Sequence, residues 1–229
     1  MKNNVIALAV AAGFLYAVAA RAQQTENMGG NMQQTMQTYK AAQYPDLSGM
    51  PGFSSQLIAN HIKLYQGYVN NTNALAEKLA AMLAEGKEKN PEYAELKRRF
   101  GWEFNGMRLH ELYFDNLGGS GIARQSSRIH KAIQDDFGSF EAWKKDFTAT
   151  GLMRGVGWTV LYRDNTSGRL FNAWINEHDG GHLAGCTPLL IMDVFEHAYL
   201  TDYQLDKAKY IEAFFMVINW DEVDKRWPK

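Results

Sequence analysis

Two long helical patterns in the first half of the sequence constrain the fold most strongly. Over residues 54–86, apolar side chains recur at three- and four-residue spacings, with a serine placed to cap the start and Gly86 placed to end the helix. A second pattern of this kind runs over residues 91–117 and is expected to break near Gly101. Together the two patterns predict a long helical hairpin in an N-terminal domain over residues 45–118.

The second half of the sequence is a smaller mixed region. The sequence GGSG at 118–121 is the best candidate for a domain boundary. Helical patterns follow around 122–136 and 139–150, and then two β-rich runs joined by a turn at Asn165–Gly168. The stretch TPLLIMDV is expected either as a third strand or as the approach to a functional site, and one final helix is expected after Asp202.

Helices followed by a small mixed part are typical of an α+β protein built in two layers. The predicted C-terminal domain is an α/β domain over residues 122–229 with a small three-stranded antiparallel sheet. The sequence contains no internal repeats.

The N-terminus has the order of a secretory signal peptide. Residues 1–22 carry a lysine, an apolar run and the small-x-small sequence Ala20-Arg21-Ala22. An uncleaved anchor is the competing interpretation, but the apolar run is shorter than the ~20 residues of a membrane-spanning helix. Residues 23–44, rich in Gln and Met, are expected to form a mobile leader. These features predict a secreted or periplasmic protein.

Composition and charge argue against some classes of function. The chain has 229 residues and a formal net charge of −1, which becomes −3 once Lys2 and Arg21 are removed with the signal. No basic excess indicates binding to nucleic acid, and no other segment is apolar enough to cross a membrane. The single cysteine, Cys186, rules out an internal disulfide framework.

The sequence IMDVFEHAYLTDY at 191–203 carries the first sign of a metal site. On a helix, Asp193 and His197 would share one face because they are four residues apart. A carboxylate and a neutral imidazole are good ligands for a first-row transition metal. Most pairs of this kind are simple hydrogen-bonded couples, so a metal site needs further ligands from elsewhere in the chain.

Those further ligands must come from the remaining histidines, which are His61, His110, His130, His178 and His182. One histidine from each long helix, added to the pair above, makes a set of three His and one Asp between the domains. Such a set suits iron or manganese with an open position for a small ligand. On its own, His110 would be interpreted as a core residue. His130 is expected on an exposed helix surface, and His178 and His182 in a loop near the strands.

Several ordered motifs resemble those of the iron/manganese superoxide dismutases. The best match lies in the tail, DVFEHAYLTDYQLDKAKYIEAFFMVINWDEV, which is similar to the family signature D-x-[WF]-E-H-A-Y and to the helix after it. Other landmarks of the family match YVNNTNAL at 68–75, FNGMRLHELYFDNL, DFGSFEAWKKDF and GVGWTVLY. The resemblance covers the chain from about Pro51 to Trp220.

The resemblance implies an enzyme that converts superoxide to O₂ and H₂O₂ at one iron or manganese ion per subunit. The metal ligands that it implies are His61, His110, Asp193 and His197. It also implies a homodimer in which Glu196 bonds the ligand histidine of the opposite subunit and orients its ring.

The same resemblance implies further catalytic residues around the metal. Tyr68 is implied at the mouth of the site, hydrogen-bonded toward the solvent ligand of the metal, and Trp158 and Phe195 as apolar walls. The residue that bonds this solvent is Gln in many members of the family and His in others. His178 lies at the spacing of the His type, with an ordinary loop histidine as the alternative. Lys207 stands where Arg is usual near the entrance, and its positive charge would attract an anion.

The first ligand departs from the family pattern. In the family this ligand lies eight residues before the tyrosine, a position that holds Asn60 here, whereas the motif PGFSSQLIANH ends on His61. One deleted residue between His61 and Tyr68 reconciles the two counts, and it would require the helix to overwind toward a 3₁₀ helix or to straighten. His61 is the preferred ligand, with Asn60 or an empty site as the alternatives.

A second departure concerns the dimer interface. The family usually pairs a gateway His on the first helix with a Tyr across the interface. These positions hold Leu64, or Tyr65 depending on the gap, and Leu200. The homodimer is therefore expected to have an altered interface. The departures also motivate an alternative function, that of a catalytically impaired family member that serves as a metal-binding or structural protein.

Overall fold

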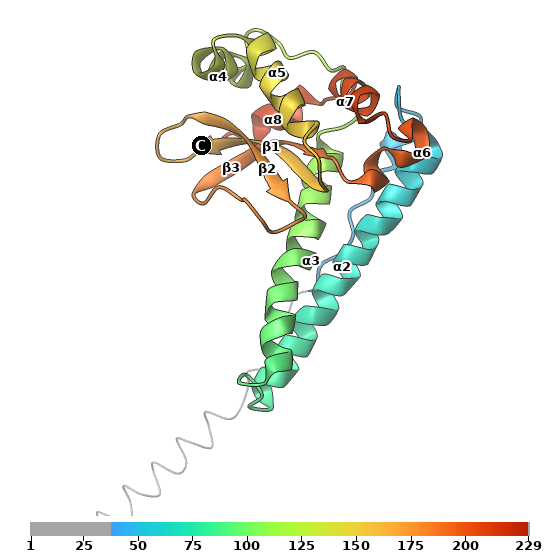
Figure 1. The fold of residues 1–229 in the computed structure, drawn as a ribbon, viewed down its shortest axis with the longest axis vertical. Helices are drawn as coiled ribbons and strands as arrows, with labels where there is room; N and C mark the ends of the chain where they lie inside the picture. Colours follow the sequence, from blue (N-terminus) through green and yellow to red (C-terminus); the bar gives the residue numbers. More distant parts are fainter. Residues whose placement is uncertain (1–37, 229) are drawn as a thin grey trace, which may run out of the picture. The chain divides into compact units, whose positions relative to one another are not determined.

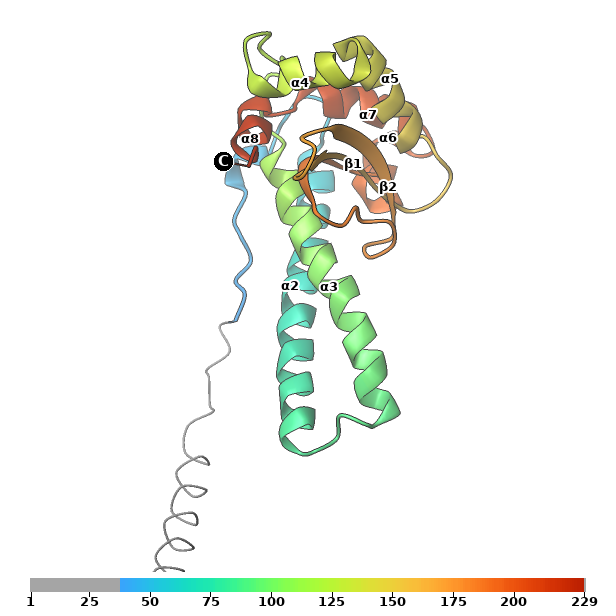
Figure 2. The same cartoon turned by 90° about the vertical axis from the view of Figure 1, so that its left-hand side faces the viewer.

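The computed structural model describes residues 38–228, so the predicted signal peptide and most of the predicted leader lie outside the described residues. After a short 3₁₀ helix, η1 (Pro45–Leu47), the chain forms helix α2 (Ser55–Ala84) and helix α3 (Pro91–Asp115). These two helices run side by side and are joined at one end by a short connection (Figures 1 and 2). The predicted helical hairpin is therefore confirmed.

Local sequence explains where the hairpin helices begin. The Ser54 side chain caps α2 by accepting the N–H of Leu57, and the Asn90 side chain caps α3 by accepting the N–H of Glu92. Helix α3 continues through Gly101, where the pattern predicts a break. A glycine in a helix costs only about 1 kcal/mol, which the packing of α3 against α2 offsets. In the part of the chain that the structure describes, none of the helices combines the length and apolar character required to span a membrane.

The second half of the chain is built on a three-stranded antiparallel sheet. Its strand order is β2–β1–β3, with β1 over Gly157–Asp164, β2 over Leu170–Asn176 and β3 over Cys186–Asp193. Two helices, α4 (Arg128–Phe137) and α5 (Phe140–Gly151), come before the sheet. The α+β fold is confirmed, and the stretch TPLLIMDV is the third strand.

The central strand β1 is covered on both faces. Trp158 packs toward α3, where its ring lies 4.9 Å from the ring of His110 between centroids. The next residue, Thr159, lies on the opposite face against Gly151 at the end of α5. Antiparallel pairing places Asp193, the last residue of β3, opposite Trp158. The sheet therefore brings both residues to the face that meets α3.

Several short helices follow the sheet, rather than the single helix that the sequence pattern predicts after Asp202. They are η2 (Glu196–Ala198), α6 (Leu200–Tyr203), α7 (Lys207–Met216) and α8 (Trp220–Lys225). The prediction is wrong because Asn219 starts a new helix. Its side chain accepts the N–H of Glu222, and its own N–H donates to the backbone oxygen of Asn116 at 2.6 Å. This second contact is tertiary and has no local signal.

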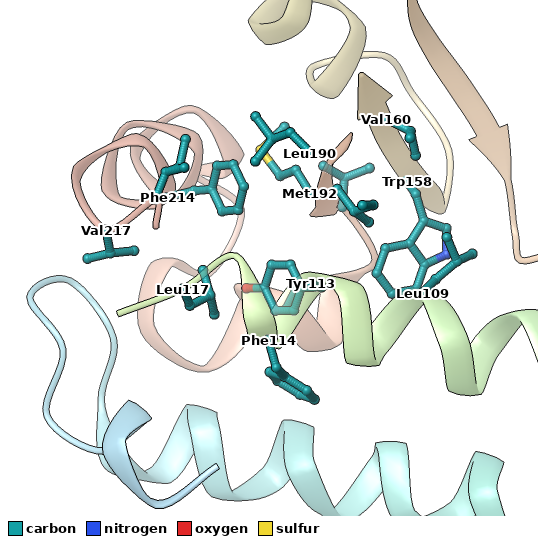
Figure 3. Packing of buried hydrophobic residues seen from close by; sticks show 14 of the residues in the cluster. Leu109, Tyr113, Phe114, Leu117, Trp158, Val160, Leu190, Met192, Phe214 and Val217 are labelled. Carbon is teal, nitrogen blue, oxygen red and sulfur yellow. The ribbon is translucent and has the colours of Figure 1, made fainter. Parts of the chain in front are cut away.

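Figure 3 shows the part of the hydrophobic core that lies between α3, the sheet and α7. The rings of Tyr113 and Phe214 stack at a centroid distance of 6.1 Å. The hydroxyl of Tyr113 lies 3.2 Å from that of Tyr210, and Tyr210 donates to the backbone oxygen of Asp193 at 2.6 Å. Core packing thus extends to the end of β3 and holds Asp193 in place.

Residues 39–44 lie along the hairpin. The backbone N–H of Tyr39 donates to Oδ1 of Asn73 at 2.8 Å, and that of Ala42 donates to the hydroxyl oxygen of Tyr65 at 2.9 Å. The end of the segment predicted to be a mobile leader is therefore held against α2.

The structure also corrects the expected place of His130. This residue is 9% exposed, and its ring stacks on Phe140 at a centroid distance of 5.2 Å. The prediction of an exposed surface position is wrong because α5 packs against this face of α4.

Candidate metal centre

Three histidines and one aspartate from distant parts of the sequence meet at one point. They come from α2, α3, the end of β3 and η2, and they are His61, His110, Asp193 and His197. Each residue offers one potential ligand atom, and these four atoms all lie within 4.8 Å of one another. The first three side chains are buried, whereas that of His197 keeps 27% of its surface exposed.

The Nε2 atoms of the three imidazoles converge on one carboxylate oxygen. Oδ2 of Asp193 lies 3.1 Å from Nε2 of His61 and 3.0 Å from that of His197. Nε2 of His110 lies 3.6 Å from the same oxygen. The other oxygen, Oδ1, accepts the backbone N–H of Phe195 at 2.9 Å. This bond orients the carboxylate, so that Oδ2 points to the imidazoles.

His110 tests whether these donor atoms fit a metal ion. Its Nδ1–H donates to the backbone oxygen of Gly106 at 2.6 Å, and burial lowers its pKa well below the ordinary value. The ring is therefore neutral, and Nε2 carries a lone pair. This buried Nε2 has no hydrogen-bond partner among the described residues, although it faces the oxygen of Asp193. Two facing lone pairs repel, whereas a cation between them satisfies both. The donor set fits a metal ion.

The charge states also suit a metal ion. Burial raises the pKa of Asp193, but the charge and hydrogen bond of His197 and those of His61 outweigh burial and hold this pKa far below its usual range. Burial lowers the pKa of His61. Metal binding requires an ionised carboxylate and imidazoles that give up their protons, and these two shifts favour both.

His61 reaches the centre from an uninterrupted α-helix. Both His61 and Tyr68 lie on the buried side of α2. Seven residues turn an α-helix by about 700°, about 20° short of two full turns, so the two side chains share one face. The expectation that the helix overwinds toward a 3₁₀ helix or straightens is therefore wrong, because an ordinary α-helix suffices. Asn60 lies on the exposed side, where its Oδ1 accepts the side-chain amide of Gln56 at 2.9 Å.

Asp193 and His197 do not lie on a common helix, contrary to the expectation. Strand β3 ends at Asp193, and His197 belongs to the 3₁₀ helix η2. The turn between them brings the carboxylate and the imidazole together. The four-residue spacing therefore pointed to two residues that do lie together, but a turn brings them together and not a helix face.

A chain of hydrogen bonds runs from the sheet to the rim of the centre. Nε1–H of Trp158 donates to Nδ1 of His178 at 3.1 Å, and Nε2 of His178 lies 2.9 Å from the hydroxyl of Tyr68. Since Nδ1 accepts, Nε2 carries the proton and donates to Tyr68. Burial lowers the pKa of His178 to about 4, so it stays neutral near pH 7. Burial also raises the pKa of Tyr68, which therefore keeps a proton to donate onward.

Comparison with known proteins identifies the family of this chain. Residues 125–226 match the family model of iron/manganese superoxide dismutases, C-terminal domain. The chain is 37% identical over 185 residues to superoxide dismutase [Fe] of Aquifex pyrophilus, covering 79% of this chain and 86% of the relative. It is 36% identical over 178 residues to superoxide dismutase [Mn] 2 of Haloferax volcanii, covering 77% and 88% of the two chains. The chain belongs to the iron/manganese superoxide dismutase family.

The other residues that the superoxide dismutase resemblance implies can now be located. Phe195 stacks on the rings of His178 and His197, at centroid distances of 4.8 and 5.0 Å. Together with Trp158, it lines the centre with aromatic surface. Glu196 is exposed beside His197. Nζ of Lys207 donates to the backbone oxygen of Met153, two residues after α5, at 3.0 Å.

The structure also distinguishes the two candidates for the superoxide dismutase gateway position. Tyr65 is fully buried, whereas Leu64 is 37% exposed and Leu200 is 46% exposed. Leu64 and Leu200 each lie three residues after a histidine of the centre. Both leucines are therefore close in sequence to the centre and exposed.

Some residues that support the centre have no clear sequence signal. Nδ1 of His182 accepts the hydroxyl of Tyr162 at 2.8 Å, and its Nε2 donates to the backbone oxygen of His178 at 2.9 Å. Gly106 accepts a hydrogen bond from His110, and Tyr210 donates one to the backbone oxygen of Asp193. Only Gly106 has a local signal, because a helical His can reach the carbonyl four residues before it.

Proposed function

We propose that this protein is a superoxide dismutase with one iron or manganese ion per chain, held by His61, His110, Asp193 and His197. The observation that carries the proposal is the convergence of three imidazole Nε2 atoms on one buried carboxylate oxygen, with the His110 tautomer set by its bond to a carbonyl. Relatives named for iron and relatives named for manganese match the chain similarly, so the proposal includes both metals.

The overall reaction consumes two superoxide anions and two protons and yields one O₂ and one H₂O₂. A bound iron or manganese ion supplies a centre that alternately accepts and returns one electron. The chain's own residues deliver protons and limit water. His178 donates to the Tyr68 hydroxyl, so the hydroxyl proton of Tyr68 stays free to be donated to another group. Trp158 and Phe195 exclude water from one side of the centre.

The catalytically impaired alternative gains no support from the residues around the centre. Its main motive is Asn60 at the expected first-ligand position, yet His61 lies within 3.1 Å of Asp193 while Asn60 lies on the exposed side of α2. The replacements at Leu64 and Leu200 lie outside the ligand set.

Location and assembly are parts of the same proposal. The signal-like residues 1–22 support a secreted or periplasmic protein, with the signal removed. A homodimer is supported by the exposure of Glu196 and by the partial exposure of His197, since a second subunit would cover both. The exposed Leu64 and Leu200 support an altered interface.

Metal content and superoxide turnover of the purified mature chain test the proposal. We expect about one iron or manganese ion per chain and turnover that depends on that metal. His61→Ala should abolish metal retention because it removes a ligand, whereas Asn60→Ala should retain the metal. A chain that stays empty after refolding with iron and with manganese would contradict the proposal. Loss of metal in Asn60→Ala alone would contradict the choice of His61.

A further inference from the structure

We propose that Trp102 is a positioning residue for superoxide dismutation, which holds Glu177 across the two halves of the site and so aligns His178 with Tyr68. This inference rests on the proposed function and deepens it. Trp102 belongs to α3, in the first half of the chain, whereas Glu177 directly follows β2.

The link between the two halves is a single hydrogen bond. Nε1–H of Trp102 donates to Oε2 of Glu177 at 2.9 Å, across 75 residues of sequence. The bond is exposed to solvent, so its importance lies in the two segments that it joins rather than in its strength. It ties the residue next to His178 to the helix that carries His110.

Glu177 has a backbone conformation that needs support. Its φ is +49°, in the left-handed region that residues other than glycine rarely adopt. Such strain persists only where the surroundings hold it. The support here comes from the backbone N–H of Glu177, which donates to the oxygen of Val156 at 3.0 Å, and from the bond to Trp102. Since His178 is the next residue, the direction of its side chain depends on this conformation.

The indole ring also touches both members of the bond that it is proposed to align. It meets the ring of His178 edge-on at a centroid distance of 4.4 Å, and that of Tyr68 at 5.6 Å. Trp102 therefore sets the His178 ring by two routes, through the backbone of Glu177 and by direct contact.

The indole ring is itself held in place. The guanidinium of Arg99 lies 3.7 Å from its ring centre, in cation–π contact. Nε of Arg99 donates to Oε1 of Glu103 at 2.8 Å, and the buried Glu103 also accepts the Asn71 amide from α2 at 3.2 Å. These contacts restrict the movement of the Trp102 ring, so its N–H stays in place to bind Glu177.

The test separates this bond from simple packing. Trp102→Phe keeps an aromatic ring but loses the N–H donor, and Glu177→Ala loses the acceptor. Glu177→Gln keeps an amide oxygen that can accept the same bond. Trp174→Phe is the matched control, because Trp174 is also half-buried but lies on β2. For each metal-loaded mature chain we would measure kcat, KM, metal content and the reduction midpoint potential of the metal.

We expect Trp102→Phe to lower kcat several-fold and at most about tenfold, because the lost bond to the carboxylate is exposed to solvent, which screens it. Proton delivery needs the aligned pair, whereas the encounter with superoxide does not, so kcat/KM should change less than about twofold. The midpoint potential should shift, because His178 and Tyr68 lie beside the ligands. Glu177→Ala should match Trp102→Phe, and the double variant should be no worse than either. Glu177→Gln should recover most of kcat, and Trp174→Phe should resemble the parent chain.

Two results would overturn the positioning role alone. The first is a parent chain with full turnover and a Trp102→Phe variant whose kcat and midpoint potential equal the parent values. The second is a variant that loses metal while kcat per bound metal stays unchanged, which would make Trp102 a packing residue. A parent chain without metal or turnover would overturn the proposed function, and this inference with it.

Discussion

At the scale of single residues, Gly106 supports the centre in two ways: its carbonyl binds His110, and its missing side chain leaves room for Tyr68. Its carbonyl accepts Nδ1–H of His110 at 2.6 Å and thereby fixes the tautomer of this imidazole. A Cβ atom at this position would lie 2.6 Å from Cδ1 of Tyr68, much closer than van der Waals contact. Glycine therefore allows the Tyr68 ring to lie against His110, at a centroid distance of 5.1 Å.

We expect Gly106→Ala to lower both stability and turnover. Overpacking costs about 1–3 kcal/mol, and the higher helix propensity of alanine returns about 1 kcal/mol, so the free energy of unfolding should fall by up to about 2 kcal/mol. Displacement of Tyr68 from His178 should lower kcat. Urea unfolding and a turnover assay measure the two effects.

Gly101→Ala is the matched control for this substitution. Gly101 lies in the same helix, and a Cβ atom there would meet nothing within 4 Å. This variant should gain up to about 1 kcal/mol of stability from helix propensity and should keep its turnover. Equal stability and equal turnover of the two alanine variants would show that the Tyr68 ring does not require a glycine at position 106.

At the scale of elements, the residues after α8 fasten the sheet to α3. The side chain of Arg226 is 10% exposed. Its guanidinium donates to the backbone oxygens of Leu189 at 3.0 Å and Leu112 at 2.9 Å, and also to the side chain of Asn116. One side chain therefore joins the end of α3 to β3, the strand that ends in Asp193.

We expect Arg226→Ala to destabilise the protein by about 2–4 kcal/mol, because buried oxygens lose their donors and a cavity remains. Arg124→Ala is the control, since Arg124 forms an exposed ion pair with Asp221 and such pairs contribute about 0–1 kcal/mol. Urea unfolding of the two metal-free variants beside the parent chain measures both changes. Similar losses in the two variants would contradict the role assigned to Arg226.

At the scale of the whole molecule, the candidate centre joins the two halves of the chain. Its ligand set takes one histidine from each hairpin helix, and the aspartate and third histidine from the segment that leaves the sheet. His197 is the member of this set that keeps exposed surface, and Glu196 and Leu200, which are close to it in sequence, are exposed too, as is Leu64 on α2. This exposed surface is therefore where the proposed second subunit would complete the enclosure of the centre.

We expect the molar mass of the mature protein, measured by sedimentation, to be twice that of one chain. Glu196→Ala should shift it toward the single-chain mass and lower its metal retention, because the residue proposed to orient His197 across the interface is lost. Glu212→Ala, which removes an exposed acid on α7, should change neither property. Analytical ultracentrifugation with metal analysis measures both, and an intact Glu196→Ala dimer with full metal content would contradict the interface.

Local patterns predicted the elements well where the cause is local. The apolar periodicity and capping residues of α2 and α3, and the turn that joins β1 to β2, act over a few residues and can be recognised without a fold. The errors occur where a distant contact decides. Asn219 separates α7 from α8 partly through its bond to Asn116, and His130 is buried because Phe140 covers it.

The sequence by itself determined the α+β fold, the family and the residue types of the candidate centre, because these depend on the order and spacing of motifs. Only the tertiary structure decided which neighbour on α2 faces Asp193, since the answer depends on the winding of one helix against the end of a strand. It also decided the tautomer of His178 and its link through Glu177 to Trp102. Those contacts join atoms from residues 20, 75 and 110 positions apart, and no local pattern encodes them.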